Sequence, residues 1–132
     1  MGKGKKTFAL GLVAVLLLLG VAGVVAMQRV VAQAEAVTIE SPTLAQVADG
    51  TYTGSHTIAP VTAEVAVTVQ DHAITDIVIT RHDTGLGRPA ERIVEDVMAQ
   101  QSLDVDSVSG ATVSSRCILK AIEAALEKGV EQ

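Results

Sequence analysis

The residues best suited to chemistry in this 132-residue chain lie together at positions 104–116. Hydroxyl side chains surround a Gly110-Ala111 pair just ahead of a helical pattern of apolar residues; they are Ser107, Ser109, Thr112, Ser114 and Ser115. Ser and Thr commonly cap the first turn of a helix. Free backbone N–H groups and the positive end of the helix dipole also favour a phosphate. Local physics therefore favours capping, with a phosphorylated ligand at the Thr112 oxygen as the alternative.

A second candidate is the glycine-containing segment Thr84-Gly85-Leu86-Gly87. Residues 85–90 formally match G-x-G-x-x-A, the fingerprint of dinucleotide binding. That fingerprint needs a parallel strand after the helix, whereas the preceding strand here belongs to a hairpin pattern, and Pro89 lacks a backbone donor. Dinucleotide binding is therefore excluded. Close approach of this backbone to some other ligand remains open beside a plain flexible turn.

The other reactive side chains form no recognisable set. His56, His72 and His82 show no ligand spacing, and the His82-Asp83 pair has no nucleophile beside it. The single Cys117 falls on the apolar stripe of a predicted helix, which is typical of a buried small side chain. We therefore predict neither catalytic residues nor a metal site.

The first third of the chain has the sequence pattern of an export segment. Lys3, Lys5 and Lys6 precede the uncharged apolar run 8–27, which as a helix matches a hydrocarbon core of about 30 Å. Its length favours a retained anchor over a cleaved signal, although small-x-small patterns at residues 32–36 keep cleavage, and hence secretion, as the alternative. The lysine bias predicts a cytoplasmic tip at residues 1–7 and an extracytoplasmic remainder.

The remainder divides into a predicted tether, residues 28–48, and one domain, residues 49–132. Short strands are predicted near 51–54, at 61–70 and at 74–81, the second with strict alternation of valine and alanine against polar residues. Helices are predicted from Pro89 to Gln101 and from Val113 to Lys128. This order predicts an α+β fold, a small antiparallel sheet covered by two helices and preceded by a single transmembrane helix.

Beyond residue 36 the chain carries 14 carboxylates against six basic residues, a net charge near −8. A nucleic-acid-binding protein needs a basic patch for the phosphate backbone. The acidic balance therefore excludes nucleic acid as a partner.

At residues 106–112 the sequence carries a resemblance to a known family. Asp106-Ser107-Val108-Ser109-Gly110-Ala111-Thr112 resembles the D-x-x-[ST]-G-A-T flavinylation motif of FMN-binding domains, found in the FMN-bearing subunits of sodium-pumping NADH:quinone reductase and Rnf-type complexes. Residues 83–87 are similar to an acidic-Thr-Pro-Gly-Leu-Gly segment that lines the flavin in that family, with the Pro absent here.

The resemblance implies FMN attached covalently through its phosphate to Thr112. Ser109, Gly110 and Ala111 would complete the motif, Asp106 would mark the site for a Mg-dependent flavin transferase, and Thr84, Gly85, Leu86 and Gly87 would line the flavin. A lone threonine hydroxyl is a poor nucleophile without a base, which favours a separate transferase over self-attachment.

Three functions follow as hypotheses. The leading one is a membrane-tethered extracytoplasmic flavoprotein that carries electrons between redox donor and acceptor proteins, or a quinone, at the membrane. The alternatives are a non-redox binding module, in which residues 109–115 only cap a helix, and a flavin-dependent reductase of a small substrate. The lack of an acid–base pair near Thr112 favours an electron-transfer protein over an enzyme with its own substrate.

Overall fold

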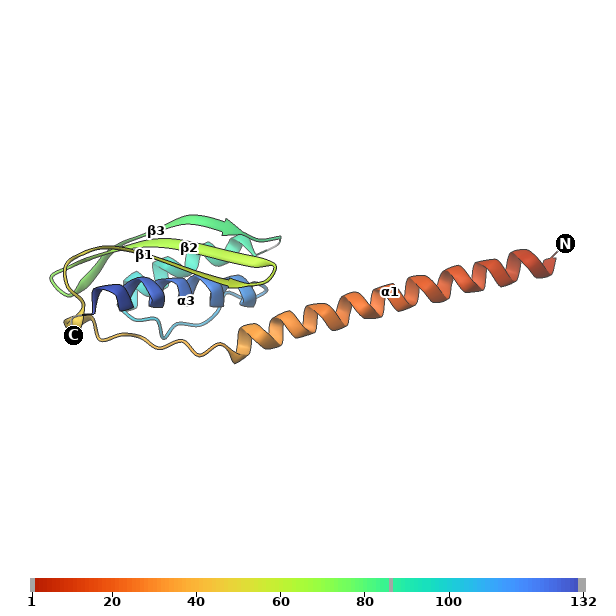
Figure 1. Cartoon of the computed structure of the whole chain (residues 1–132), viewed down its shortest axis with the longest axis horizontal. Helices are drawn as coiled ribbons and strands as arrows, with labels where there is room; N and C mark the ends of the chain where they lie inside the picture. The colour runs from red at the N-terminus through yellow and green to blue at the C-terminus, as the bar shows by residue number, and fades with distance from the viewer. Residues whose placement is uncertain (1, 86, 131–132) are drawn as a thin grey trace.

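The computed structural model describes residues 2–85 and 87–130 of the chain. A long helix, α1 (Gly2–Ala36), projects from a small α+β domain like a rod (Figure 1). Its 35 residues correspond to a length of about 52 Å. The domain confirms the predicted fold class, with a three-stranded antiparallel sheet and helices packed on it.

The sheet is a meander of β1 (Gly50–Ile58), β2 (Val61–Gln70) and β3 (Ala73–Asp83). Strand β2 has the predicted bounds, and its side chains alternate between buried and half-buried. Asp71 and His72 join it to β3 with φ angles of 51° and 61°, as a two-residue hairpin turn requires. The predicted hairpin is therefore confirmed.

Two register shifts in the β2–β3 ladder change which β3 side chains face the core. One lies between Thr68 and Val69 and the other between Glu64 and Val65 of β2. Each inserts an extra residue in β3, so that Ile74, Ile77 and His82 pair with buried positions of β2 although they do not share one alternation. The second shift turns the His82 side chain inward, where only 3% of it is exposed.

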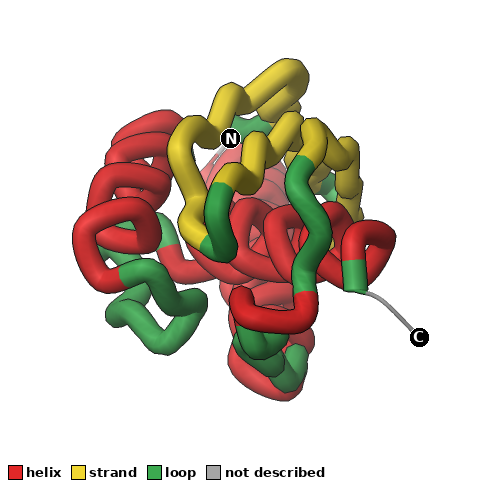
Figure 2. The backbone as a smooth tube through the Cα atoms, turned by 90° about the vertical axis from the view of Figure 1, so that its left-hand side faces the viewer, coloured by secondary structure: helices red, strands yellow, loops and turns green. Residues whose placement is uncertain are grey.

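The helical layer consists of the 3₁₀ segment η2 (Arg88–Arg92), α2 (Ile93–Gln100) and α3 (Thr112–Gly129). Figure 2 shows these helices gathered on one side of the strands. Helix α3 lies so close to β1 that a Cβ on Gly54 would stand 2.1 Å from the Ala121 carbonyl oxygen. The interior is aliphatic, and Cys117 lies fully buried within it, as predicted. Burial raises the pKa of the Cys117 thiol.

Residues 28–48, predicted to form a tether, are ordered against the domain. Residues 28–36 continue α1, and the following segment runs along α3 on the side away from the sheet (Figure 1). The Lys120 ammonium donates to the Thr38 carbonyl at 2.9 Å, and the Glu123 carboxylate accepts from the Glu40 amide at 3.1 Å. An isolated bridge between Val47 and Val130 joins the end of this segment to the residue that follows α3.

Among the described residues, α1 is the helix long and apolar enough to cross a membrane, over Gly4–Ala36. Its apolar stretch is not buried against the domain. An anchor and a signal sequence share these properties.

Candidate functional site

The hydroxyl-rich segment forms a tight turn that leads into α3. Gly110 has a φ of 78°, a left-handed conformation that favours glycine. The Ala111 amide donates to the Val108 carbonyl, and the Val108 amide donates to Ser115 Oγ, both at 2.9 Å. Since Ser115 belongs to α3 and is fully buried, it fastens the turn to the helix that follows.

The hydroxyls do not cap α3 in the way local physics favoured. The N-cap residue is Ala111, and it makes no side-chain capping bond. Ser109 is exposed, and within the described part of the chain the Thr112 hydroxyl has no hydrogen-bond partner. The capping interpretation is therefore wrong, because Ser115 bonds to the turn and leaves Thr112 free for other use.

The glycine segment meets the first turn of α3. Thr84 Oγ1 lies 3.0 Å from Ser114 Oγ and accepts a hydrogen bond of 3.0 Å from the Gly87 amide. Ser114 is almost fully buried, so this contact is shielded from water. The two segments singled out in the sequence are thus joined through a pair of hydroxyls. Leu86, the remaining predicted residue of the glycine segment, lies outside the described residues.

Gly87 is required here by packing rather than by backbone conformation. Its φ and ψ of −85° and 4° are open to other residues. A Cβ at this position would lie 2.0 Å from Ser114 Oγ and 2.5 Å from Thr84 Oγ1. By contrast, a Cβ on Gly85 would meet no atom within 4 Å. The two glycines of the segment therefore have different roles.

Both segments line one cavity of about 480 Å³. Six predicted site residues border it: Thr84, Gly85, Gly87, Gly110, Ala111 and Thr112. Ser109 and Asp106 do not; both are exposed on the turn outside. Ser109 and Asp106 are thus exposed residues outside the cavity wall.

The opposite wall comes from residues that sequence reasoning did not assign to the site. Facing the two segments are Ala26, Met27, Val30 and Val31 of α1, with Pro60 before β2 and Val61 at its start; Val113 and Ser114 extend the α3 side. Their uniformly small or apolar character gives no local signal of a ligand. A hollow along residues 4–15 of α1 is larger, about 910 Å³, but it is the open side of a single helix with no wall from the domain.

A second cavity, of about 340 Å³, lies on the other side of the glycine segment and is polar. It shares Thr84 and Gly85 with the first and is otherwise lined by Ile79, Thr80, Arg81, His82, Arg88 and Glu91. Arg88 Nε lies 3.6 Å from Glu91 Oε2, and His82 Nδ1 lies 3.9 Å from Glu91 Oε1. A hydrogen bond to Asp83 raises the pKa of Arg81.

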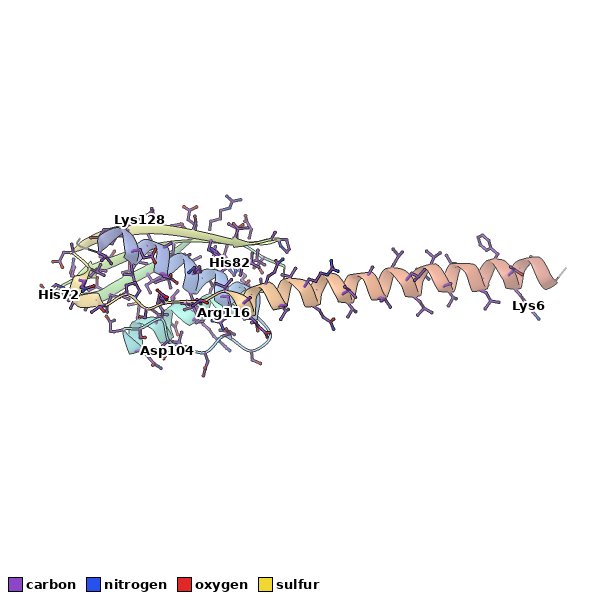
Figure 3. All side chains as sticks on the ribbon, turned by 60° about the horizontal axis from the view of Figure 1, so that its bottom comes forward. Lys6, His72, His82, Asp104, Arg116 and Lys128 are labelled. Atoms are coloured by element: carbon purple, nitrogen blue, oxygen red, sulfur yellow. The ribbon has the colours of Figure 1, made fainter. Side chains whose placement is uncertain are left out.

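The remaining histidines stand apart from both cavities. Burial, followed by the nearby Lys120 ammonium, lowers the pKa of His56. His72 lies at the end of the domain opposite α1 (Figure 3). Among the residues that the structure describes, no three His, Cys, Asp or Glu side chains are grouped as metal ligands.

Comparisons with known proteins agree with the motif. The family model of the FMN-binding domain matches residues 59–127, more than half of the chain. An NADH:acrylate oxidoreductase from Vibrio harveyi is 38% identical over 66 residues, which are 48% of this chain and 7% of that protein. The chain thus corresponds to a small part of that relative. No solved structure matches. On the family match, which spans both segments of the apolar cavity, this chain belongs to the FMN-binding domain family.

Proposed function

We propose that the protein is a membrane-tethered extracytoplasmic flavoprotein that carries electrons through FMN attached covalently, by its phosphate, to Thr112. The observation that carries this proposal is the Thr112 hydroxyl itself. It lies at the first residue of the 18-residue helix α3, borders the 480 Å³ cavity and has no hydrogen-bond partner among the described residues.

The residues around Thr112 fit a phosphate ester. Free N–H groups and the dipole at a helix N-terminus favour a negatively charged group. Gly110 and Ala111 place almost no side-chain volume beside the hydroxyl, so a bulky phosphorylated ligand can approach it. Because the α3 hydroxyls that could compete are held by Thr84 and Val108, Thr112 is the one left for attachment.

The cavity fits the flavin by size and by polarity. Its volume lies within the range of roughly 300–1,000 Å³ typical of small-molecule sites. Its walls are aliphatic, with no aromatic side chain among the described lining residues to stack on a ring system. A covalent bond holds a cofactor where such contacts alone are weak, and FMN supplies the redox chemistry that these side chains lack.

The lining also favours a carrier over a reductase. None of the described residues that border this cavity has a carboxylate, imidazole or amine that could act as a general acid or base. A reductase of a small substrate would need such a group for proton transfer. The oxidoreductase activity named for the Vibrio protein belongs to a chain of which this one matches 7%.

The proposed location follows from α1, whose lysine-flanked apolar run predicts an extracytoplasmic domain. A flavin transferase would attach the FMN there, and redox proteins or a membrane quinone would exchange electrons with it. The non-redox binding module is the alternative if no flavin is attached.

The test is to express the full chain with and without an active Mg-dependent flavin transferase. We expect a mass increase equal to one FMN and a fluorescent band that survives denaturation, only with the transferase. An unmodified, colourless protein beside a transferase that labels another substrate contradicts covalent attachment. Protease digestion of intact and permeabilised cells tests the location, since an extracytoplasmic domain is cut without permeabilising the inner membrane.

A further inference from the structure

Arg116 is a cation without a partner on the helix that begins at Thr112. Its Nε atom is buried and has no hydrogen-bond partner within the described residues. No described carboxylate forms an ion pair with its guanidinium either. Burying part of a guanidinium without a partner is costly, so an arginine in this state is suited to bind an anionic group.

The helix places Arg116 beneath the proposed attachment site. Thr112 and Arg116 are four residues apart in α3, which puts them on the same face with Cβ atoms about 5–6 Å apart. Side chains on a helix lean toward its N-terminus, which for Arg116 is the direction of Thr112. Arg116 is not itself among the described residues that line the cavity. Figure 3 shows Arg116 at the end of the domain where α1 joins it, the end that contains the cavity.

The neighbouring cation on the same face of α3, Lys120, does have partners. Lys120, one turn further along α3, donates to the Thr38 carbonyl and to both carboxylate oxygens of Glu123 at 2.9–3.1 Å. Glu123 is itself buried and also accepts from the Glu40 amide. Lys120 is therefore fully occupied in packing residues 37–41, whereas Arg116 is not.

We propose that Arg116 binds the phosphate of the flavin at Thr112, so that it is a phosphate-positioning residue of the site. This inference rests on the proposed function, because it requires FMN to occupy the cavity. A planar guanidinium presents paired N–H donors that match two phosphate oxygens, and such charge-assisted bonds are about twice as strong as neutral ones. The negative charge of the phosphate would in turn neutralise the partly buried guanidinium.

The test compares two free ligands that differ only in the phosphate, FMN and riboflavin, on the full chain carrying Thr112→Val in a non-ionic detergent. The detergent contains no lipid phosphate that would compete for Arg116. Binding is measured by quenching of flavin fluorescence. We expect FMN to bind more tightly than riboflavin, and Arg116→Gln to reduce that preference by about 10-fold or more while riboflavin affinity stays the same.

Two further variants separate the charge from a structural role. Arg116→Lys keeps the positive charge but not the paired N–H donors, so it should keep part of the preference for FMN over riboflavin. Arg92→Gln, which removes an exposed arginine in η2, should leave it unchanged. An equal loss of FMN and riboflavin binding in Arg116→Gln would show that the arginine supports the cavity rather than the phosphate, and would overturn the proposal.

The outcome also distinguishes this inference from the proposed function. If transferase-dependent labelling of Thr112 succeeds but Arg116→Gln leaves the FMN preference intact, only the role of Arg116 is wrong. If the wild-type chain does not accept covalent FMN and the Thr112→Val chain does not prefer FMN to riboflavin, both proposals fail. A further arm adds vesicles of an anionic phospholipid to the detergent assay. If lipid binding depends on Arg116 and FMN binding does not, the partner of Arg116 is a lipid phosphate.

Discussion

The two cavities on either side of Thr84 and Gly85 have opposite chemistry although they share a wall. The polar cavity contains Arg81, Arg88 and Glu91, and its charges pair with neighbouring side chains. The apolar cavity has aliphatic walls and, at Thr112, a hydroxyl without a hydrogen-bond partner among the described residues. Side-chain charges that already have partners gain little binding free energy from a ligand. The Thr112 hydroxyl, by contrast, can still form a bond to a ligand in the apolar cavity.

The difference also supports the proposed covalent bond on the apolar side. An aliphatic wall provides contact area but few directional bonds, so position must come from a single anchored atom. The hydrogen bonds among Thr84, Ser114 and Gly87 then serve to hold the wall rather than the ligand. The two cavities should therefore respond differently to substitution.

The largest effect is expected from Thr112→Ala, which removes the proposed point of attachment. Covalent FMN should be lost completely, as measured by intact mass after co-expression with the transferase. Ser107→Ala is the matched control, since Ser107 occupies a variable position of the motif and does not border the cavity, so its loss should leave Thr112 available. FMN that remains on Thr112→Ala would place the attachment at a different residue.

Next in size is Gly87→Ala, which forces a methyl group against Ser114 and Thr84. Overpacking of this kind destabilises by about 1–3 kcal/mol, and the free energy of unfolding in denaturant measures it. Gly85→Ala adds the same methyl group to open space and should be close to neutral. Because Ser114 Oγ is the nearest atom, adding Ser114→Ala should restore part of the stability lost in Gly87→Ala. Equal stability of the Gly87→Ala and Gly85→Ala variants would contradict the close packing at Gly87.

A smaller effect is expected from Val30→Ala in the α1 wall. Val30 is half-buried and borders the apolar cavity, so its truncation should cost at most about 1 kcal/mol. It should, however, expose attached FMN to iodide, which quenches flavin fluorescence on collision. Leu19→Ala, on an exposed part of the same helix, should not change quenching. If neither variant alters quenching, α1 does not shield the cofactor.

The smallest effect is expected from Arg88→Gln in the polar cavity. The Arg88 side chain is 88% exposed, and exposed ion pairs contribute between zero and about 1 kcal/mol. Unfolding in denaturant and the yield of covalent FMN should both stay near the wild-type values. A clear loss of covalent FMN in Arg88→Gln would show that the two cavities act as one site.

Much of the domain could be predicted because its signals are local. The alternation in residues 61–70 specifies a half-buried strand, and the bounds of β2 agree with it. The motif ending at Thr112 and the glycine segment at 84–87 were singled out from residue types and resemblance, and the described members of the second lie at one cavity with Gly110, Ala111 and Thr112. Short-range pattern was sufficient for these elements.

The rest depended on contacts between distant parts of the chain. Nothing in an apolar helix distinguishes the residues that face lipid from those that, like Met27 and Val30, border a cavity. The register shifts that turn His82 inward arise from pairing with β2, so the β3 sequence alone does not display them. Capping was favoured for the hydroxyls because the bond from the Val108 amide to Ser115 Oγ could not be foreseen.

The contacts of residues 37–48 have a mechanical consequence. An electron carrier on a flexible tether can move its cofactor between a donor and an acceptor that stand far apart. Here Lys120 and Glu123 bind residues 37–48 at Thr38 and Glu40. Ser41 in the same segment accepts a hydrogen bond from the Leu103 amide at 3.2 Å. These bonds hold the segment after α1 against the domain. With FMN bound as proposed, redox partners would come to the flavin in turn, because the flavin would not move between them.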